Sequence, residues 1–329
     1  MTLVRPAGAD VMAVPLRPLT ERVLARLGRP RLLWMLAWGM LALAAYEVTF
    51  RIFRSPTYPG RFVAAYVNLL AIWAIAKVTA DLEAIRPLVQ RLTGRTAGPD
   101  YWPFQAVESV AGPLALGLME TILWNVVDFI RHPGPATAML IPIMFVAWLP
   151  AEVALWFFGA LLVRLYRLGR RPLRLSPFEE DRSLGLRPLG SIAFTSFVVM
   201  TAAMLPLTAT QWRDLRGAIT GLVFFLGFVG LFFASLYGLH RQMVDAKVAA
   251  LEQTHHLYVA AFQPIRAQWS LERVAEQSAR LTAAEAIERR AGAIQEWPLD
   301  EGLLARLAAV VTSVIGVILA RLILSRFGL

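Results

Sequence analysis

Residues 217–239 read GAITGLVFFLGFVGLFFASLYGL, a run of 23 residues without a charged side chain. At 1.5 Å per residue a helix of this length measures about 35 Å, enough to cross the ~30 Å hydrocarbon core of a bilayer. The charged segment HRQMVDAK follows directly at 240–247. The stretch therefore predicts a membrane-spanning helix that continues into a polar segment.

The composition of the whole chain agrees with this interpretation. Of its 329 residues, 57% are hydrophobic and 17% are charged, and the mean hydropathy is +0.55. Soluble domains average about 45–50% apolar and about 25% charged residues. These values exclude an ordinary soluble enzyme and a disordered chain, and they predict an integral membrane protein.

Seven stretches are long and apolar enough to cross a bilayer, which predicts an all-α, polytopic membrane protein. They are residues 32–50, 62–80, 109–130, 137–163, 189–210, 217–239 and 303–325. The third stretch is the least regular, because Gly112, Pro113, Glu120, Asn125 and Asp128 interrupt its hydrophobicity. Four parts are expected: a basic N-terminal segment (1–31), a six-helix membrane region (32–239), a cytoplasmic helical hairpin (240–301), and a final span with a short C-terminus (302–329).

The positive charges are sorted between alternate connecting segments. If the N-terminus lies in the cytoplasm, 25 of the 33 Lys and Arg residues fall on the cytoplasmic side. Because cytoplasmic loops carry this excess, the sorting predicts an N-terminus inside and a C-terminus outside. The 31 Arg against 2 Lys suit a GC-rich bacterial genome, so the expected location is a bacterial plasma membrane. No signal-peptide core precedes Leu32, so the first span is expected to direct its own insertion. The net charge of +10 then requires no nucleic-acid partner.

The composition also limits the chemistry. The chain has no cysteine and only four histidines, His132, His240, His255 and His256, which leaves little for a thiolate or histidine metal site. It contains no His-Glu-x-x-His, Gly-x-Ser-x-Gly or P-loop motif. We therefore expect no enzymatic activity, no cofactor and no bound metal.

The largest polar element lies between the last two spans. A coiled-coil spacing of fours and threes connects Val244, Val248, Leu251, His255, Tyr258 and Phe262. This helix is expected to end or bend at Pro264, and a second helix to run from near Ser270 to before Trp297. Such helices can pack within one chain or between chains, and we expect a hairpin that also meets neighbouring subunits of a homo-oligomer.

His255 occupies one position of this spacing. Protonation of a histidine at a helical interface weakens packing as the pH falls toward about 6, which makes His255 a candidate pH sensor. The alternative is a histidine whose ring simply points out of a loose interface into water.

Ionisable residues inside a span are costly, so each one suggests a functional site. Glu120 lies at the centre of the third stretch and Glu152 near the centre of the fourth, and we expect the two carboxyl groups to face each other near the midplane. Further candidates for an ion or transport site lie nearer the outer side of the membrane. They are Asn68, Asn125, Asp128 and Glu47.

Helix-breaking residues precede both glutamates. Gly112 and Pro113 come before Glu120, and Pro142 and Pro150 come before Glu152. In many transporters the freed carbonyl groups of interrupted helices line an ion site. The alternative is that both carboxyl groups are protonated and hydrogen-bond to neighbouring helices, which contributes about 0.6–2 kcal/mol each to packing.

Two short segments, HRQMVDAK (240–247) and Trp297-Pro298-Leu299-Asp300, resemble segments of uncharacterised prokaryotic multi-pass membrane proteins. The resemblance covers at most the last third of the chain and implies no activity. From the residues, we expect an oligomeric channel or transporter for protons or small cations, gated or assembled by the hairpin. The alternative is a sensor or scaffold, anchored in the lipid bilayer, whose hairpin recruits a cytoplasmic protein.

Overall fold

A computed structural model describes residues 17–27, 30–53, 60–94, 102–131, 133–175, 181–209, 215–267 and 271–326. Within these ranges the regular structure is helical and contains no strand. The helices are α1 (Leu19–Leu27), α2 (Arg31–Phe53), α3 (Gly60–Ala84), α4 (Arg86–Thr93), the short 3₁₀ helix η1 (Gln105–Glu108), α5 (Ala111–Arg131), α6 (Pro135–Gly169), α7 (Arg187–Ala209), α8 (Leu215–Ala267), α9 (Leu271–Gly292) and α10 (Glu301–Arg326).

Six of the described helices are long and apolar enough to cross a membrane: α2, α3, α6, α7, α8 and α10. They confirm the predicted all-α class and suggest a multi-pass membrane protein. The predicted third span corresponds to α5, whose described apolar part is the shorter stretch Ala111–Leu123. The described helices thus give six candidate spans, with α5 as the candidate for a seventh.

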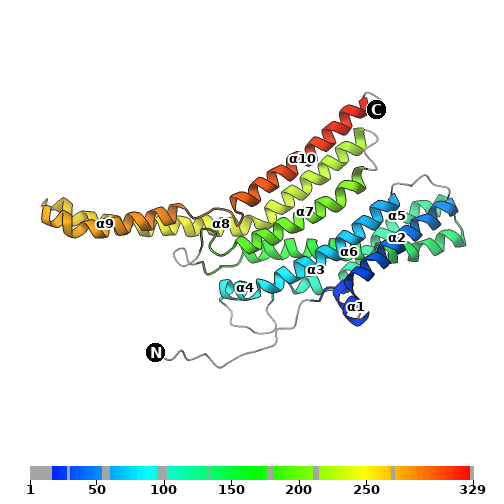
Figure 1. The fold of residues 1–329 in the computed structure, drawn as a ribbon, viewed down its shortest axis with the longest axis horizontal. Coiled ribbons are helices and arrows are strands. Elements are labelled where there is room, and N and C mark those ends of the chain that lie inside the picture. The colour runs from blue at the N-terminus through cyan, green and yellow to red at the C-terminus, as the bar shows by residue number, and fades with distance from the viewer. Residues whose placement is uncertain are drawn as a thin grey trace.

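Helix α6 lies at the centre of the bundle. It packs against α2, α3, α5, α7 and α8, and its side chains Phe157, Phe158 and Leu165 are fully buried in the core. In Figure 1, α7, α8 and α10 form one group of helices and α2, α3, α5 and α6 form another. The two groups meet on the side that carries α4 and point apart at their other ends.

Two glycines allow α6 and α8 to cross in backbone contact. A Cβ atom on Gly169 would lie 2.6 Å from the Leu239 nitrogen, and one on Gly238 would lie 2.6 Å from the Gly169 carbonyl carbon. Just beyond the crossing, the Gln242 side-chain amide donates to the carbonyl oxygens of Gly169 (2.5 Å) and Arg171 (2.7 Å). The last carbonyl groups of a helix have no hydrogen-bond donor within that helix. Gln242 of α8 supplies such a donor at the C-terminus of α6.

Helix α8 is continuous from Leu215 to Ala267 and therefore runs three residues past Pro264. It leaves the bundle together with α9, which packs against it (Figure 1). The buried side chains on this part of α8 are Met243, Ala250 and Thr254, not those of the predicted coiled-coil spacing. Small side chains at 250 and 254 let the two helices approach closely, so the intrachain contact uses another face of α8 from the one with heptad spacing.

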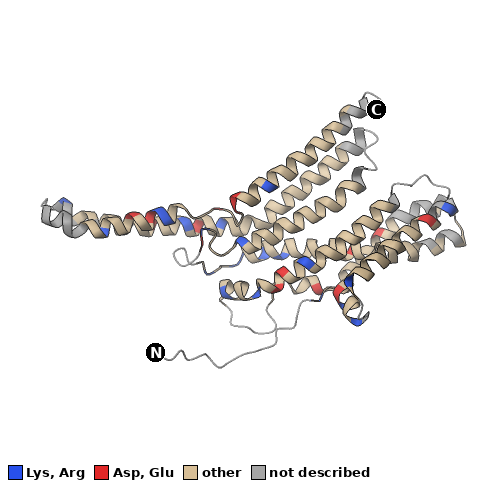
Figure 2. Ribbon diagram, viewed as in Figure 1, with Lys and Arg blue, Asp and Glu red and all other residues tan. Residues whose placement is uncertain are grey.

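The base of the α8–α9 pair is attached to the bundle by residues in and beside the segments 240–247 and 297–300. The His240 ring stacks on Trp297 with 4.2 Å between ring centroids, and Lys247 Nζ lies 3.1 Å from Glu296 Oε1. Asp300 Oδ2 pairs with the Arg187 guanidinium at 2.6 Å. In Figure 2, positive residues gather around this end of the bundle, whereas the described parts of α7, α8 and α10 further from it are tan and carry no charged side chain.

Candidate functional site

The candidate site lies between α5 and α6, and the start of α5 differs from the prediction. Gly112 and Pro113 do not interrupt a span, because they form the first turn of a helix that begins at Ala111. The Ser109 hydroxyl accepts the Gly112 N–H at 3.1 Å, which caps this turn. Proline is tolerated in a first turn because its missing N–H would have no helical partner there.

Glycines on α5 bring it close to α6. A Cβ atom on Gly112 would overlap the Trp156 ring, and one on Gly117 would lie 3.0 Å from Glu152 Cγ. The Trp156 Nε1 also donates to the Ala106 carbonyl oxygen at 3.2 Å, which fixes the ring beside the start of α5. The close approach places the Glu152 side chain directly against α5.

Glu120 and Glu152 meet at this contact. Each lies at about the middle of its helix, Glu120 in α5 (Ala111–Arg131) and Glu152 in α6 (Pro135–Gly169). Their carboxyl groups lie close enough to share a hydrogen bond. An ionised carboxylate can only accept, so such a bond forms when one of the two groups carries a proton. The expectation that the two carboxyl groups face each other matches this arrangement.

The environment of the pair is closed on the Glu152 side and more open on the Glu120 side. Glu152 is only 4% exposed, and its Oε2 has no hydrogen-bond partner among the described residues, whereas Glu120 is half-buried. None of the ion pairs in the described part of the chain joins a Lys or Arg to either carboxyl group. The pair therefore has spare acceptor capacity in a buried position.

Pro150 breaks one hydrogen bond of α6, because it has no N–H to donate to the Val146 carbonyl. The Trp38 Nε1 on α2 donates to that oxygen instead, at 3.0 Å. Asn68 on α3 is fully buried, and its amide donates to the next carbonyl oxygen, that of Ala147, at 2.9 Å. The freed Val146 carbonyl oxygen thus has a donor from a neighbouring helix, and the expectation that freed carbonyls line an ion site stays a prediction.

The surroundings of Pro150 are correspondingly apolar. A cavity of about 30 Å³ beside it is lined largely by hydrophobic side chains, among them Trp34, Leu149 and Val153. Ala147 and Glu152 are five positions apart, which places them about 140° around α6 from each other. Asn68 therefore lies on a different side of α6 from the glutamate pair, and the structure does not bring the two predicted features together.

The remaining predicted residues lie elsewhere. Glu47, near the end of α2, is partly exposed and pairs with Arg51 at 3.1 Å. His255 on α8 is exposed, and its ring centroid lies 6.3 Å from that of His256. Asn125 and Asp128 belong to α5, but their side chains lie outside the described residues. The pH-sensor role of His255 stays a prediction.

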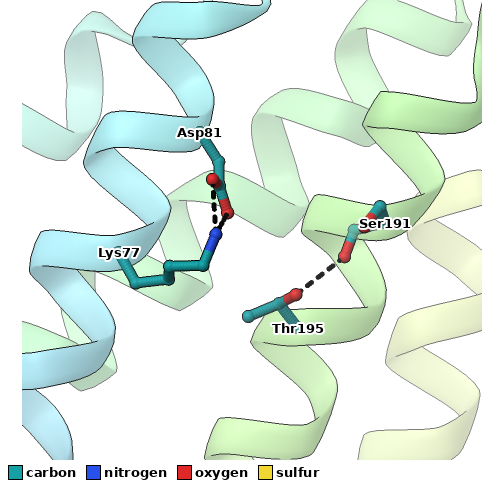
Figure 3. A network of polar contacts seen from close by, with 4 residues as sticks. All are labelled: Lys77, Asp81, Ser191 and Thr195. Carbon is teal, nitrogen blue, oxygen red and sulfur yellow. Dashed lines mark hydrogen bonds and ion pairs between the residues drawn. The ribbon is translucent and has the colours of Figure 1, made fainter.

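The one lysine within the predicted spans is neutralised inside its own helix. Lys77 Nζ lies 2.6 Å and 2.8 Å from the two carboxylate oxygens of Asp81, one turn later on α3. Figure 3 shows this pair facing Ser191 and Thr195 of α7, where the Thr195 hydroxyl donates to the Ser191 carbonyl oxygen at 3.0 Å. Lys77 therefore pairs with Asp81 and not with Glu120 or Glu152.

Sequence reasoning missed Trp38, Gly117 and Trp156, which shape this region. Pro150 signals that the Val146 carbonyl needs a donor, but only the packing of α2 on α6 identifies Trp38 as that donor. The described residues contain no group of three or more His, Asp or Glu side chains that could hold a metal. Comparison of the chain with protein-family models, curated proteins and solved structures gives no match.

Proposed function

We propose that the protein is a membrane channel or transporter for protons or small cations, and that Glu120 and Glu152 form its ion site. The observation that carries this proposal is the close approach of two carboxyl groups at the middle of two packed, apolar helices. Ionisable groups at that depth are costly and are concentrated on ion and proton pathways.

The chemistry of the glutamate pair favours exchange of a proton for a cation. With one shared proton the pair carries a single negative charge, and exchange of that proton for a monovalent cation between the two carboxylates leaves the charge unchanged. Carboxylate oxygens are suitable ligands for hard cations. The unpartnered Glu152 Oε2 provides an acceptor for either species.

The proposed topology has seven spans, with α5 as the third. Helix α5 has 21 residues and a length of about 31 Å, which suits a bilayer core. It packs along α6, and α6 begins four residues after α5 ends, as expected for antiparallel neighbours in one membrane layer. The excess of positive charge supports a cytoplasmic position for the N-terminus and the α8–α9 hairpin, in the plasma membrane of a bacterial cell.

The test is ion flux in liposomes that contain the purified protein and a pH-sensitive dye inside. An inward proton gradient, with or without Na⁺ or K⁺ on the opposite side, should give flux well above that of empty liposomes. Glu152→Gln should reduce the flux at least tenfold, because an amide cannot exchange a proton or a cation. Glu47→Gln, a carboxyl group outside the site, is the matched control and should retain the wild-type rate.

Absence of flux for all three ions, or an unchanged flux in Glu152→Gln, would remove the transport proposal. The second candidate function, a membrane-anchored scaffold or sensor, is favoured by one observation: apolar side chains of α8 beyond the bundle are exposed, among them Val248 and Phe262. In that case the glutamate pair only packs helices, and the hairpin of the intact protein binds a cytoplasmic protein without any accompanying flux.

A further inference from the structure

The uncharged run of α8 ends at Leu239, but apolar side chains recur on the helix beyond it. The run 217–239 measures about 35 Å as a helix, which already suits the ~30 Å core of a bilayer. The charged residues from Arg241 to Lys247 mark where the helix leaves the membrane, so the apolar residues after them lie in water unless protein covers them.

This outer part of α8 has two faces, and α9 covers only one of them. The covered face consists of Met243, Ala250 and Thr254, each at most 2% exposed. We name the second face the α8 seam. It consists of Val244, Val248, Leu251, His255, Tyr258 and Phe262.

Most of the α8 seam is open, whereas Val244 and Leu251 are half-buried. Val248 is 57% exposed, Tyr258 is 37% exposed and Phe262 is 39% exposed. At 100° per residue the centre of the seam lies roughly 100° around the helix from the covered face. In a four-helix bundle each helix touches two neighbours about a quarter turn apart. The hairpin therefore has the form of half of such a bundle, with one neighbour in place and the second position empty.

We infer that the α8 seam packs against the same seam of a second copy of this chain, so that two hairpins form a four-helix bundle. Heptad spacing with apolar residues at both repeating positions specifies a helical partner. Because both copies cross the membrane in the same direction, their α8 helices run parallel. In a parallel pair each seam residue lies opposite its own counterpart.

The charges beside the seam fit this parallel pairing. With the seam residues at the two core positions of the heptad, Lys247 and Glu252 occupy the two flanking positions. In a parallel pair, Lys247 of one copy lies beside Glu252 of the other, and the symmetry creates this opposite-charge contact twice. Glu252 is exposed and available for it. Lys247 also contacts Glu296 of its own chain, but its ammonium group has three protons and serves both carboxylates.

Cysteine crosslinking in native membranes tests the pairing, because the chain has no cysteine of its own. Val248→Cys and Tyr258→Cys place thiols at two exposed seam positions, where paired helices bring identical residues within reach of a disulfide. Leu257→Cys is the matched control. Leu257 is adjacent to Tyr258 and 47% exposed, but it lies about 140° around the helix from the seam centre.

With a mild oxidant, Val248→Cys and Tyr258→Cys should each give a disulfide-linked dimer in at least fivefold higher yield than Leu257→Cys. Glu252→Lys added to Val248→Cys should lower the yield severalfold, with a smaller loss at high salt, because Lys247 of the second copy then faces a positive charge. Equal yields at the three positions, no dimer at the seam positions, or adducts with a different protein would each overturn the proposal. Crosslinking reports contact and not ion flux, so its outcome is independent of the transport proposal.

Discussion

Helices α6 and α8 cross in backbone contact at Gly169 and Gly238. The distances at this crossing allow the cost of a larger side chain there to be worked out. Gly238→Ala would place a Cβ atom 2.6 Å from the Gly169 carbonyl carbon and 2.8 Å from its oxygen. Ordinary contacts of a Cβ atom are 3.4–4 Å, so the two backbones must separate by about 1 Å. The neighbouring atoms are backbone and have no alternative rotamer.

The expected cost combines three effects. Overpacking of a close helix contact costs about 1–3 kcal/mol. The separation also lengthens the hydrogen bonds from Gln242 to Gly169 and Arg171, each worth about 1 kcal/mol. Alanine offsets about 0.5–1 kcal/mol of this through its higher helix propensity. We expect Gly238→Ala to lower the free energy of unfolding by about 2 kcal/mol in total.

Unfolding in mixed micelles, followed by far-ultraviolet circular dichroism over a denaturant titration, measures this difference. Gly230→Ala is the matched control on the same helix, because a Cβ atom there meets nothing within 4 Å. It should be neutral or stabilising by up to about 1 kcal/mol. If Gly238→Ala and Gly230→Ala unfolded with free energies within about 0.5 kcal/mol of each other, the inferred close crossing would be refuted.

Two further predictions concern polar groups. The Asp181 carboxylate accepts hydrogen bonds from Gly185 N–H (2.9 Å) and from the hydroxyl and N–H of Ser183 (2.7 and 3.1 Å). Burial raises its pKa, but these bonds and the charge of Arg187 outweigh burial and hold the pKa below its ordinary value. Asp181→Asn should therefore lower the free energy of unfolding by about 0.5–1 kcal/mol at pH 7, after allowance for the exposure of Asp181. The stability difference between wild type and variant should vanish as the pH falls below about 4 and through the lowered pKa of Asp181. A stability difference that persists at acid pH would contradict this. Asn68→Leu should cost about 1–3 kcal/mol in the same unfolding assay, because it removes the two hydrogen bonds that the buried Asn68 amide donates to the Ala64 and Ala147 carbonyl oxygens. An unchanged stability would show that these two bonds do not stabilise the fold.

Hydrophobic length predicted the membrane class and most helix positions, because a bilayer imposes one length on every span. It also predicted that Glu120 and Glu152 meet, since each lies at the middle of its apolar stretch and the two stretches are neighbours in the chain. The role of Gly112 and Pro113 was misjudged for a local reason. Ser109 caps a helix that starts at Ala111, so both residues lie in a first turn where they disrupt nothing.

Other features depended on which faces of the helices touch, and periodicity does not decide this. On α8 the heptad spacing of Val248 and Tyr258 is the more conspicuous pattern, yet α9 packs on the smaller residues Ala250 and Thr254. Small side chains carry little hydrophobic signal but allow the closest approach. Likewise the need of the Val146 carbonyl for a donor follows from Pro150, whereas the choice of Trp38 follows only from the three-dimensional packing.

The central claim is that Glu120 and Glu152 act as one site with one shared proton. Proton flux in liposomes, measured for wild type, Glu120→Gln, Glu152→Gln and the double variant, tests it most directly. If the pair is one unit, each single variant abolishes the site, and the double variant should be no slower than either single variant. Losses that multiply in the double variant, or single variants that retain the wild-type flux, would contradict the claim.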